Sequence, residues 1–462
     1  MANMNSTIKK LNIAYIGGGS RGWALNFMTD LALAKELGGR IRLYDIDHKA
    51  SKINEKIGND LKKDKRCLSD FTYESVGSLK TALDKADFVV ISILPGTFDE
   101  MESDVHCPEK YGIYQSVGDT AGPGAYIRGL RTIPMFIEIA EAIRKYAPNA
   151  WVINFTNPMS LCIKTLYETF PKIKAFGCCH EVFNTQEVLA KITAQELGLK
   201  KISRQDIFTN VVGINHFTWF TRASYKDIDI FPIYKKYVAE HFKEGFEYTS
   251  DNWMNSYFSC GHKVKFDLYR KYHYIAAAGD RHLAEFMPGD LYLKDPKTVE
   301  KWKFTLTPVS WRKEDLERRL QRSRRIYENK EKLQLKPTGE EAVLLIKALC
   351  GLGNMVSNVN LPNYGLQIPN LPEDAIVESN ALFSRDDVSP IYAGEVPEKI
   401  RELIMPHIKN HQVIYDAVIN KDRKLVYKAF ENDPNINGRL SKKQIRQLVD
   451  EMIENTSKYC TI

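Results

Sequence analysis

Three residues that could do chemistry stand together in Cys179-His180-Glu181, just after a short β-branched run that begins at Ile173. A helix-like segment, 185–197, follows them, so the three residues are predicted to lie at the carboxyl end of a strand. Open α/β sheets bind their ligands outside those strand ends. A thiolate and an imidazole can bind a divalent metal, and a carboxylate can accept a proton. Two buried cysteines with a helix-capping acid are the alternative interpretation, because free cysteine is usually buried.

Polar side chains at four further places could join such a site. Asp119 lies in a glycine-rich loop, and Asn157 follows a buried strand. His216 stands between apolar residues, and ionisable groups crowd the segment 279–288. Turn formation, helix capping, core packing and i, i+4 ion pairs explain these residues at least as well on spacing alone. The spacing therefore nominates them without showing that any of them meets Cys179.

The element that would hold a cofactor begins at residue 11. Leu11–Ile16 is predicted to form a buried strand and Trp23 to about Leu33 a helix, with a glycine-rich loop between them. In that setting the first glycine allows a tight turn, the third lets a pyrophosphate approach the backbone, and the last lets the helix pack closely on the strand. The next strand, 40–44, ends in Asp45, where a carboxylate accepts hydrogen bonds from an adenosine ribose.

These features together predict NAD, because a carboxylate at residue 45 would repel the 2′-phosphate of NADP. A glycine turn beside a surface aspartate is the alternative interpretation. The predicted cofactor contacts are Gly17, Gly18, Gly19, Ser20, Arg21, Gly22 and Asp45.

Strands and helices alternate along the first 200 residues, which predicts a doubly wound parallel sheet of the Rossmann type. The pattern then changes to mixed strands and helices, with closing helices at about 397–420 and 442–454. The predicted architecture is α/β. An NAD-binding Rossmann-like domain over residues 1–200 precedes a mixed α+β domain for substrate binding and oligomerisation over residues 201–462.

Composition excludes several classes of protein. The chain has 462 residues, and Lys plus Arg exceed Asp plus Glu by 65 − 58 = 7. The basic residues are scattered, so no nucleic-acid partner is expected. No apolar run is long enough to cross a bilayer, and Met1 to Lys10 is polar, so we expect a cytoplasmic protein with no membrane partner. Eight cysteines in such a chain are expected to be reduced thiols.

Taken together the motifs resemble glycoside hydrolase family 4, the NAD- and metal-dependent glycosidases, over nearly the whole chain. The combination of motifs is specific. The matching segments are Ile16-Gly17-Gly18-Gly19-Ser20, Gly118-Asp119-Thr120-Ala121-Gly122-Pro123-Gly124, Asn154-Phe155-Thr156-Asn157-Pro158-Met159, Cys179-His180-Glu181-Val182, Gly213-Ile214-Asn215-His216 and Asn370-Leu371-Pro372.

The resemblance implies roles for individual residues. Cys179 and His216 would be the ligands of a divalent metal, usually Mn²⁺. Asn157 would contact the substrate, and Asp119 would tune the catalytic base. The Cys-His-Glu-Val form is similar to the α-galacturonidase subgroup, because α-glucosidases and α-galactosidases tend to have serine where this chain has Glu181.

The base that removes the sugar C2 proton is less well matched. Several family members use a tyrosine, whereas Asp280 and its neighbours occupy the corresponding region here. Asp280 is our first choice, followed by His282 and a nearby tyrosine. His180 is counted with Asp280 and Asp119 among the catalytic residues.

The resemblance implies an uronide-containing oligosaccharide as the substrate and a homodimer or homotetramer as the assembly. A uronate carboxylate needs a cation, for which Arg281 and Arg128 are the candidates. The expected mechanism is NAD-dependent oxidation at C3, deprotonation at C2, elimination at C1, and then addition of water and return of the hydride. The rivals are a lactate- or malate-type dehydrogenase acting on a small 2-hydroxy acid, which would accumulate NADH and need no metal, and a non-catalytic NAD sensor.

Overall fold

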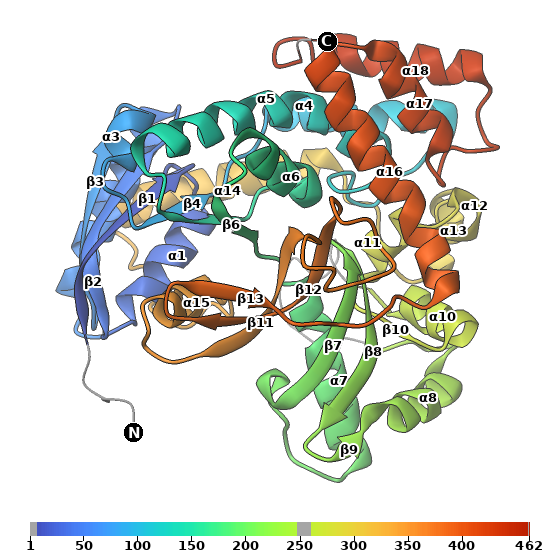
Figure 1. Cartoon of the computed structure of the whole chain (residues 1–462), viewed down its shortest axis with the longest axis horizontal. Helices are drawn as coiled ribbons and strands as arrows, with labels where there is room; N and C mark the ends of the chain where they lie inside the picture. The colour runs from blue at the N-terminus through green and yellow to red at the C-terminus, as the bar shows by residue number, and fades with distance from the viewer. Residues whose placement is uncertain (1–6, 247–259, 461) are drawn as a thin grey trace.

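The computed structural model describes residues 7–246, 260–460 and 462 (Figure 1). One part of the sequence discussed above, the polar stretch 1–10, therefore lies partly outside the described residues. No helix among the described residues is both long and apolar enough to cross a bilayer.

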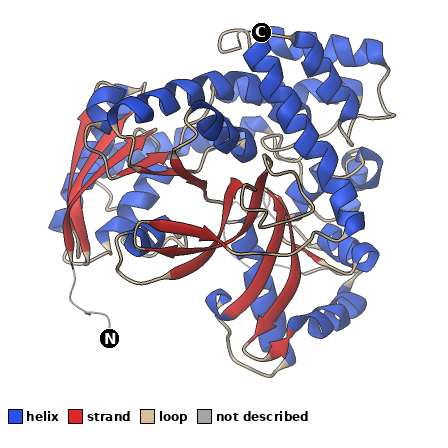
Figure 2. Cartoon of the chain, viewed as in Figure 1, coloured by secondary structure: helices blue, strands red, loops and turns tan. Residues whose placement is uncertain are grey.

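A nine-stranded sheet forms the larger layer of the molecule (Figures 1 and 2). Six of its strands are parallel and follow the spatial order β3-β2-β1-β4-β5-β6, which is the Rossmann order. This arrangement confirms the doubly wound sheet predicted from the alternation of elements. The six strands are β1 (Ile8–Ile16), β2 (Leu37–Tyr44), β3 (Asp70–Val76), β4 (Phe88–Ile91), β5 (Trp151–Asn154) and β6 (Lys174–Gly177).

Helices cover both faces of this sheet, because its central strands are apolar on both sides. One face packs against α1 (Trp23–Ala32) and α15 (Ala342–Leu349). The other face packs against α5 (Gly122–Tyr146) and α6 (Met159–Thr169). The remaining helices of the first half are α2 (His48–Asp60), α3 (Leu79–Leu83), α4 (Phe98–His106) and α7 (Glu181–Glu196).

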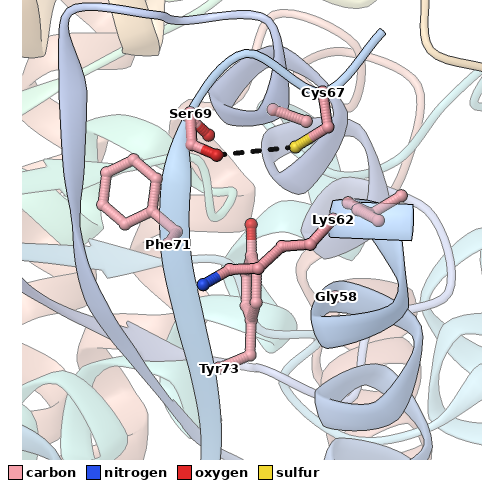
Figure 3. A pocket seen from close by; sticks show the side chains of 8 residues that line it. Gly58, Lys62, Cys67, Ser69, Phe71 and Tyr73 are labelled. Carbon is pink, nitrogen blue, oxygen red and sulfur yellow. Dashed lines mark hydrogen bonds between the residues drawn. The ribbon is translucent and has the colours of Figure 1, made fainter. Parts of the chain in front are cut away.

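Close packing of α2 on β3 leaves only a small hollow between them, which Figure 3 shows. Gly58 faces the ring of Tyr73 so closely that an added Cβ would overlap it. The Cys67 thiol lies at the rim, 3.6 Å from the Ser69 carbonyl oxygen. This hollow is a packing feature of the helix and strand.

The second half of the chain completes the large sheet and adds a smaller one. β11 (Met355–Pro362) pairs antiparallel with β6, and β12 (Ile376–Ser384) and β13 (Asp387–Pro390) extend the edge. The smaller antiparallel sheet contains β7 (Ile207–Ile214), β8 (Phe217–Tyr225), β9 (Ile228–Asp229) and β10 (Ile275–Ala276). The two sequence halves therefore share the large sheet, and the boundary near residue 200 stays a prediction.

Helices of the second half pack against the small sheet or against helices of the first half, and the last three of them, within residues 398–455, form the part of the molecule drawn in red in Figure 1. Their packed cores are continuous with α5 and with the small sheet. They are α8 (Ile230–His241), α10 (Lys263–Tyr272), α11 (Asp280–Glu285), α12 (Gly289–Tyr292), α13 (Pro296–Lys301), α14 (Val309–Tyr327), α16 (Glu398–Asn420), α17 (Arg423–Asn432) and α18 (Lys442–Asn455).

Candidate active site

Cys179 and His216 meet at the carboxyl end of β6. The Cys179 Sγ lies 3.1 Å from Nε2 of His216, although the two residues are 37 positions apart. His216 belongs to the two-residue turn between β7 and β8 and has a φ of +62°. Its Nδ1 lies 2.7 Å from the hydroxyl oxygen of Thr120. The turn and the threonine together aim the other ring nitrogen at the cysteine.

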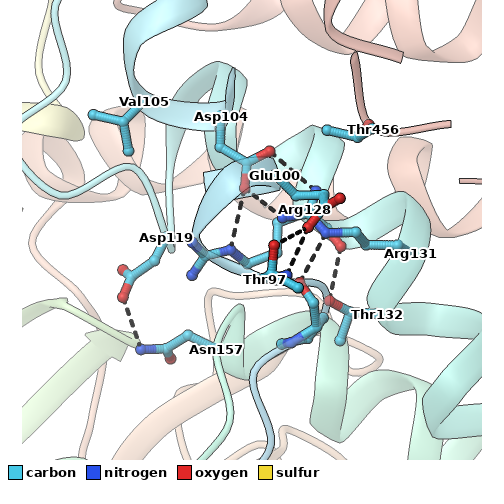
Figure 4. Close-up of polar contacts among 12 residues, drawn as sticks. Thr97, Glu100, Asp104, Val105, Asp119, Arg128, Arg131, Thr132, Asn157 and Thr456 are labelled. Atoms are coloured by element: carbon cyan, nitrogen blue, oxygen red, sulfur yellow. Dashed lines mark hydrogen bonds and ion pairs between the residues drawn. The ribbon is translucent and has the colours of Figure 1, made fainter. Parts of the chain in front are cut away.

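Asp119 stands beside this pair. Its carboxylate accepts hydrogen bonds from the Thr120 hydroxyl at 2.8 Å and from the Asn157 amide at 3.3 Å (Figure 4). Ligand atoms of Asp119, His216 and His282 all lie within 4.8 Å of one another. Burial would raise the pKa of Asp119, but the positive charges around it, including that of Arg128, hold its pKa well below the ordinary value.

The donor atoms fit a divalent cation. Burial lowers the pKa of His216 to about 3, which leaves its imidazole neutral and able to bind a metal at neutral pH. The two ring nitrogens of His216 thus lie near a thiol sulfur on one side and the Asp119 loop on the other, so sulfur, nitrogen and carboxylate oxygen surround this imidazole. These are the donor types that Mn²⁺, Fe²⁺, Co²⁺ or Zn²⁺ would accept.

His282 and Asp280 point in different directions from α11. The His282 ring lies 3.8 Å from the His216 ring, centroid to centroid, and its Nε2 is 3.9 Å from a carboxylate oxygen of Glu181. The Asp280 carboxylate instead accepts the backbone N–H groups of Val264 at 3.0 Å and Lys265 at 3.2 Å, at the start of α10. Asp280 is therefore engaged as a helix cap, and its role as a base stays a prediction.

Glu181 and His180 face different parts of the site. The Glu181 carboxylate accepts the Gly279 N–H at 2.7 Å and faces His282. His180 lies 3.3 Å from Glu340 and stacks on Trp23 at the start of α1. His180 is thus directed toward the glycine-rich loop.

The glycine-rich loop fits a dinucleotide. The first turn of α1 has neither a side-chain cap nor an acidic residue, so its N–H groups are available to an anion. Gly17 has a φ of +93°, and a Cβ there would overlap the Ser92 carbonyl. Gly18 faces Leu43 of β2 just as closely, whereas a Cβ on Gly22 would meet only the guanidinium of Arg319. The close packing expected of Gly22 is therefore supplied by Gly17 and Gly18.

Arg319 is a cation beside the glycine-rich loop that no motif in the sequence could have singled out. It lies on the charged helix α14, nearly 300 positions after the loop with which its guanidinium is in contact. Its position adds a cation beside the N-terminus of α1, where a pyrophosphate would lie.

Asp45 holds the same loop from the other side. One of its carboxylate oxygens accepts the Gly19 N–H at 2.7 Å and the other accepts the Asp47 N–H at 2.8 Å. The carboxylate is thereby fixed at the end of β2, where an adenosine ribose would lie.

Replacing Asp45 with alanine is expected to weaken NAD binding by about 10- to 100-fold, the value of a hydrogen bond to a charged group, and to weaken NADP binding much less. Fluorescence titration of both cofactors measures the two dissociation constants. Asp47→Ala is the matched control, because Asp47 caps α2 and its loss should not change the NAD to NADP ratio. Equal losses for both cofactors in Asp45→Ala would contradict the ribose assignment.

The two candidate arginines differ sharply in their surroundings. Arg281 donates to the carbonyl oxygens of Ser116 at 2.7 Å and Thr305 at 3.3 Å and also contacts the Thr307 hydroxyl. The buried Arg128 faces Asp104 at 3.6 Å, and its Nε and Nη2 atoms have no hydrogen-bond partner among the described residues.

Figure 4 shows the Arg128 guanidinium on the side of Asp119. The Asp104 carboxylate is already held by two hydrogen bonds from Arg131. Of the two candidate arginines, Arg128 therefore has nitrogen atoms to offer a ligand, whereas Arg281 is engaged in holding loops together.

The chain belongs to the family 4 glycosyl hydrolases. The family model for the family 4 glycosyl hydrolases matches residues 12–195, and the model for their C-terminal domain matches residues 211–436. Membership confirms the class suggested by the motifs and favours a glycosidase over the dehydrogenase and the NAD sensor.

Individual relatives and solved structures show which members of the family this chain is similar to. An alpha-galacturonidase of Lachnoclostridium phytofermentans is 58% identical over 455 residues, which are 98% of this chain and 98% of that protein. The crystal structure of the Bacillus subtilis protein lplD is 49% identical and superposes with a TM-score of 0.91, covering 96% of this chain and all of the other. A 6-phospho-alpha-glucosidase from gut microorganisms, solved in complex with NAD and Mn²⁺, shares the fold with a TM-score of 0.77 at 20% identity, over 98% of this chain and 99% of that one.

Proposed function

We propose that this protein hydrolyses α-galacturonides, with NAD and Mn²⁺ as its resident cofactors. The observation that carries the proposal is the contact between Cys179 and His216 beside Asp119, at the carboxyl edge of a Rossmann sheet. A dehydrogenase of the lactate or malate type has no use for this soft, buried pair of metal ligands. The 58% identity to an alpha-galacturonidase supports the choice of sugar.

Residues of this chain would hold both cofactors. The loop 17–22, Asp45 and the N-terminus of α1 would bind the dinucleotide, and Cys179 with His216 would bind the metal. Once bound, the two groups would supply a hydride acceptor for C3 of the sugar and a Lewis acid for its oxygens. A C3 ketone makes the C2 proton acidic, so the remaining task of the protein is to move that proton and to release the group at C1.

We favour His282 over Asp280 as the group that takes the C2 proton. His282 lies against His216, and its Nδ1 is buried with no hydrogen-bond partner among the described residues. Burial lowers its pKa, so the ring is neutral and basic at neutral pH, and Glu181 lies where it can steady the imidazolium that forms. Asp119 and Asn157 would orient sugar hydroxyls. Release of the group at C1 and addition of water there would then give a net hydrolysis.

Hydrolysis in D₂O tests the reaction class. We expect p-nitrophenyl α-galacturonide, incubated with NAD⁺, Mn²⁺ and a thiol reductant, to give galacturonate that carries deuterium at C2, because that proton is lost and regained. NMR of the product measures the label, and absorbance at the NADH band should stay flat during turnover. Product without C2 deuterium would contradict the elimination, and NADH rising in step with product would favour the dehydrogenase.

The metal identity, the compartment and the assembly are part of the same proposal. The donor set suits several divalent cations, and among them Mn²⁺ is supported by the structural neighbour that was solved with NAD and Mn²⁺. A cytoplasmic location is supported by eight free cysteines, two of them vicinal. A homodimer or a dimer of dimers remains our expectation, since closed symmetric assemblies are the common case.

A further inference from the structure

A buried carboxylate links the two segments that carry Cys179 and His216. Glu378 lies on β12 and is 1% exposed. Its Oε1 accepts a hydrogen bond from the Asn358 amide at 2.6 Å, and its Oε2 accepts one from the Asn215 amide at 3.2 Å. No motif in the sequence nominated this residue.

Each of those asparagines is joined to one of the proposed metal ligands. Asn215 directly precedes His216 in the turn between β7 and β8. The Asn358 amide lies 3.4 Å from the carbonyl oxygen of Cys179, and β11, which carries Asn358, is the strand that pairs with β6. One carboxylate therefore connects the end of β6, its neighbouring strand β11 and the turn between β7 and β8.

This connection has a physical task. A non-glycine residue with a φ near +60° lies in the strained left-handed region, so the turn that presents His216 needs contacts that hold it. A buried hydrogen bond to a carboxyl group supplies such a contact, and its stabilising effect on the turn is lost if either partner is removed. Groups just outside a metal site commonly set the positions of the ligands in this way.

We propose that Glu378 is a positioning residue that holds Cys179 and His216 at the separation a metal requires. The inference rests on the metal site of the proposed function. Glu378 contacts neither substrate nor cofactor in this role; it acts through Asn358 and Asn215. Its removal should therefore weaken the metal site while leaving intact the dinucleotide site, which lies beyond the carboxyl ends of β1 and β2 and makes no contact with Glu378.

The test is the binding of Mn²⁺ alone, followed by electron paramagnetic resonance of the free ion, with no sugar present. In Glu378→Gln, an amide replaces one acceptor oxygen with a donor that faces another amide, and we expect Mn²⁺ affinity to fall by about 10- to 100-fold. The NAD dissociation constant should stay within about twofold of the original. Excess Mn²⁺ should restore kcat, which a merely structural defect would not allow.

Two further variants separate this role from general packing. Asn380→Ala removes a hydrogen bond from the same strand to the Thr209 carbonyl and should leave Mn²⁺ affinity unchanged. Asn215→Ala removes one of the hydrogen bonds to Glu378 and leaves the Glu378 carboxyl group itself unchanged. It should weaken Mn²⁺ binding as Glu378→Gln does. Unchanged Mn²⁺ affinity in both Glu378→Gln and Asn215→Ala would overturn the inference, whereas an original protein that binds no Mn²⁺ would overturn the metal site and this inference together.

Discussion

Cys179→Ser should lower kcat/KM for an α-galacturonide by about 10³-fold or more. A serine hydroxyl is a poor substitute for a thiolate at a soft metal site, and loss of a bound Lewis acid removes several kcal/mol of transition-state stabilisation, of which each 1.4 kcal/mol is a factor of ten. NAD affinity should be nearly unchanged, because the glycine-rich loop makes no use of the thiol. Initial rates at saturating Mn²⁺ and a fluorescence titration with NAD measure the two quantities.

Cys178→Ser is the matched control for this variant. Cys178 has the same chemistry one position earlier, but its side chain packs against the hydrophobic core of the large sheet. The Cys178→Ser variant should change the stability of the fold modestly and still require Mn²⁺ for activity. Treatment of the original protein with EDTA should reproduce the Cys179→Ser defect, and full activity in Cys179→Ser would remove Cys179 from the metal site.

We expect kcat/KM for p-nitrophenyl α-galacturonide to exceed that for the matching α-galactoside by roughly 10⁴-fold, because only the galacturonide carries the carboxylate. A site built to pair a charged group rejects an analogue that lacks it, because the buried partner is then left without its counterpart. Arg128 is the best-placed partner, since two of its nitrogen atoms are buried with no hydrogen-bond acceptor among the described residues. Steady-state rates on the two substrates measure the ratio.

Arg128→Met should lower the galacturonide rate by about 30-fold or more, in line with the 2 kcal/mol or more lost when one partner of a buried charge pair is truncated, and should affect the galactoside far less. Arg281→Met provides the contrast. Because Arg281 holds the backbones of Ser116 and Thr305, its loss should lower the melting temperature and both rates together. Equal rates on both substrates in the original protein would refute the choice of sugar.

Much of the fold could be predicted because its signals are local. The apolar run of β1, the glycines after it and the acid at the end of β2 lie within 35 residues and were recognised in order. Their structural roles were less predictable. Which neighbour each glycine meets depends on elements that arrive later in the chain, as Arg319 does at Gly22.

In the candidate site, too, the sequence nominates residues by their type, and only the folded chain shows which of them make contact. Cys179 and His216 could each be nominated by type, but their contact depends on a turn of the small sheet that lies against the edge of the large one. Asp280 and His282 are two positions apart on α11 and therefore project about 200° apart around the helix axis. Only the packing of α11 against α10 and the small sheet decides which of them faces His216, and it selects His282.

By itself the sequence determined the class of this protein. The order of strand, glycines, helix and acid specifies a dinucleotide fold through hydrogen bonds and steric limits that act over a few residues. The tertiary structure alone decided which polar side chains share one small volume, and it is the basis for the roles proposed for His282, Arg128, Arg319 and Glu378. Long-range packing sets these neighbourhoods, as when β11 and β12 bring Glu378 to the end of β6 and α14 brings Arg319 to Gly22, and no spacing along the sequence encodes those distances.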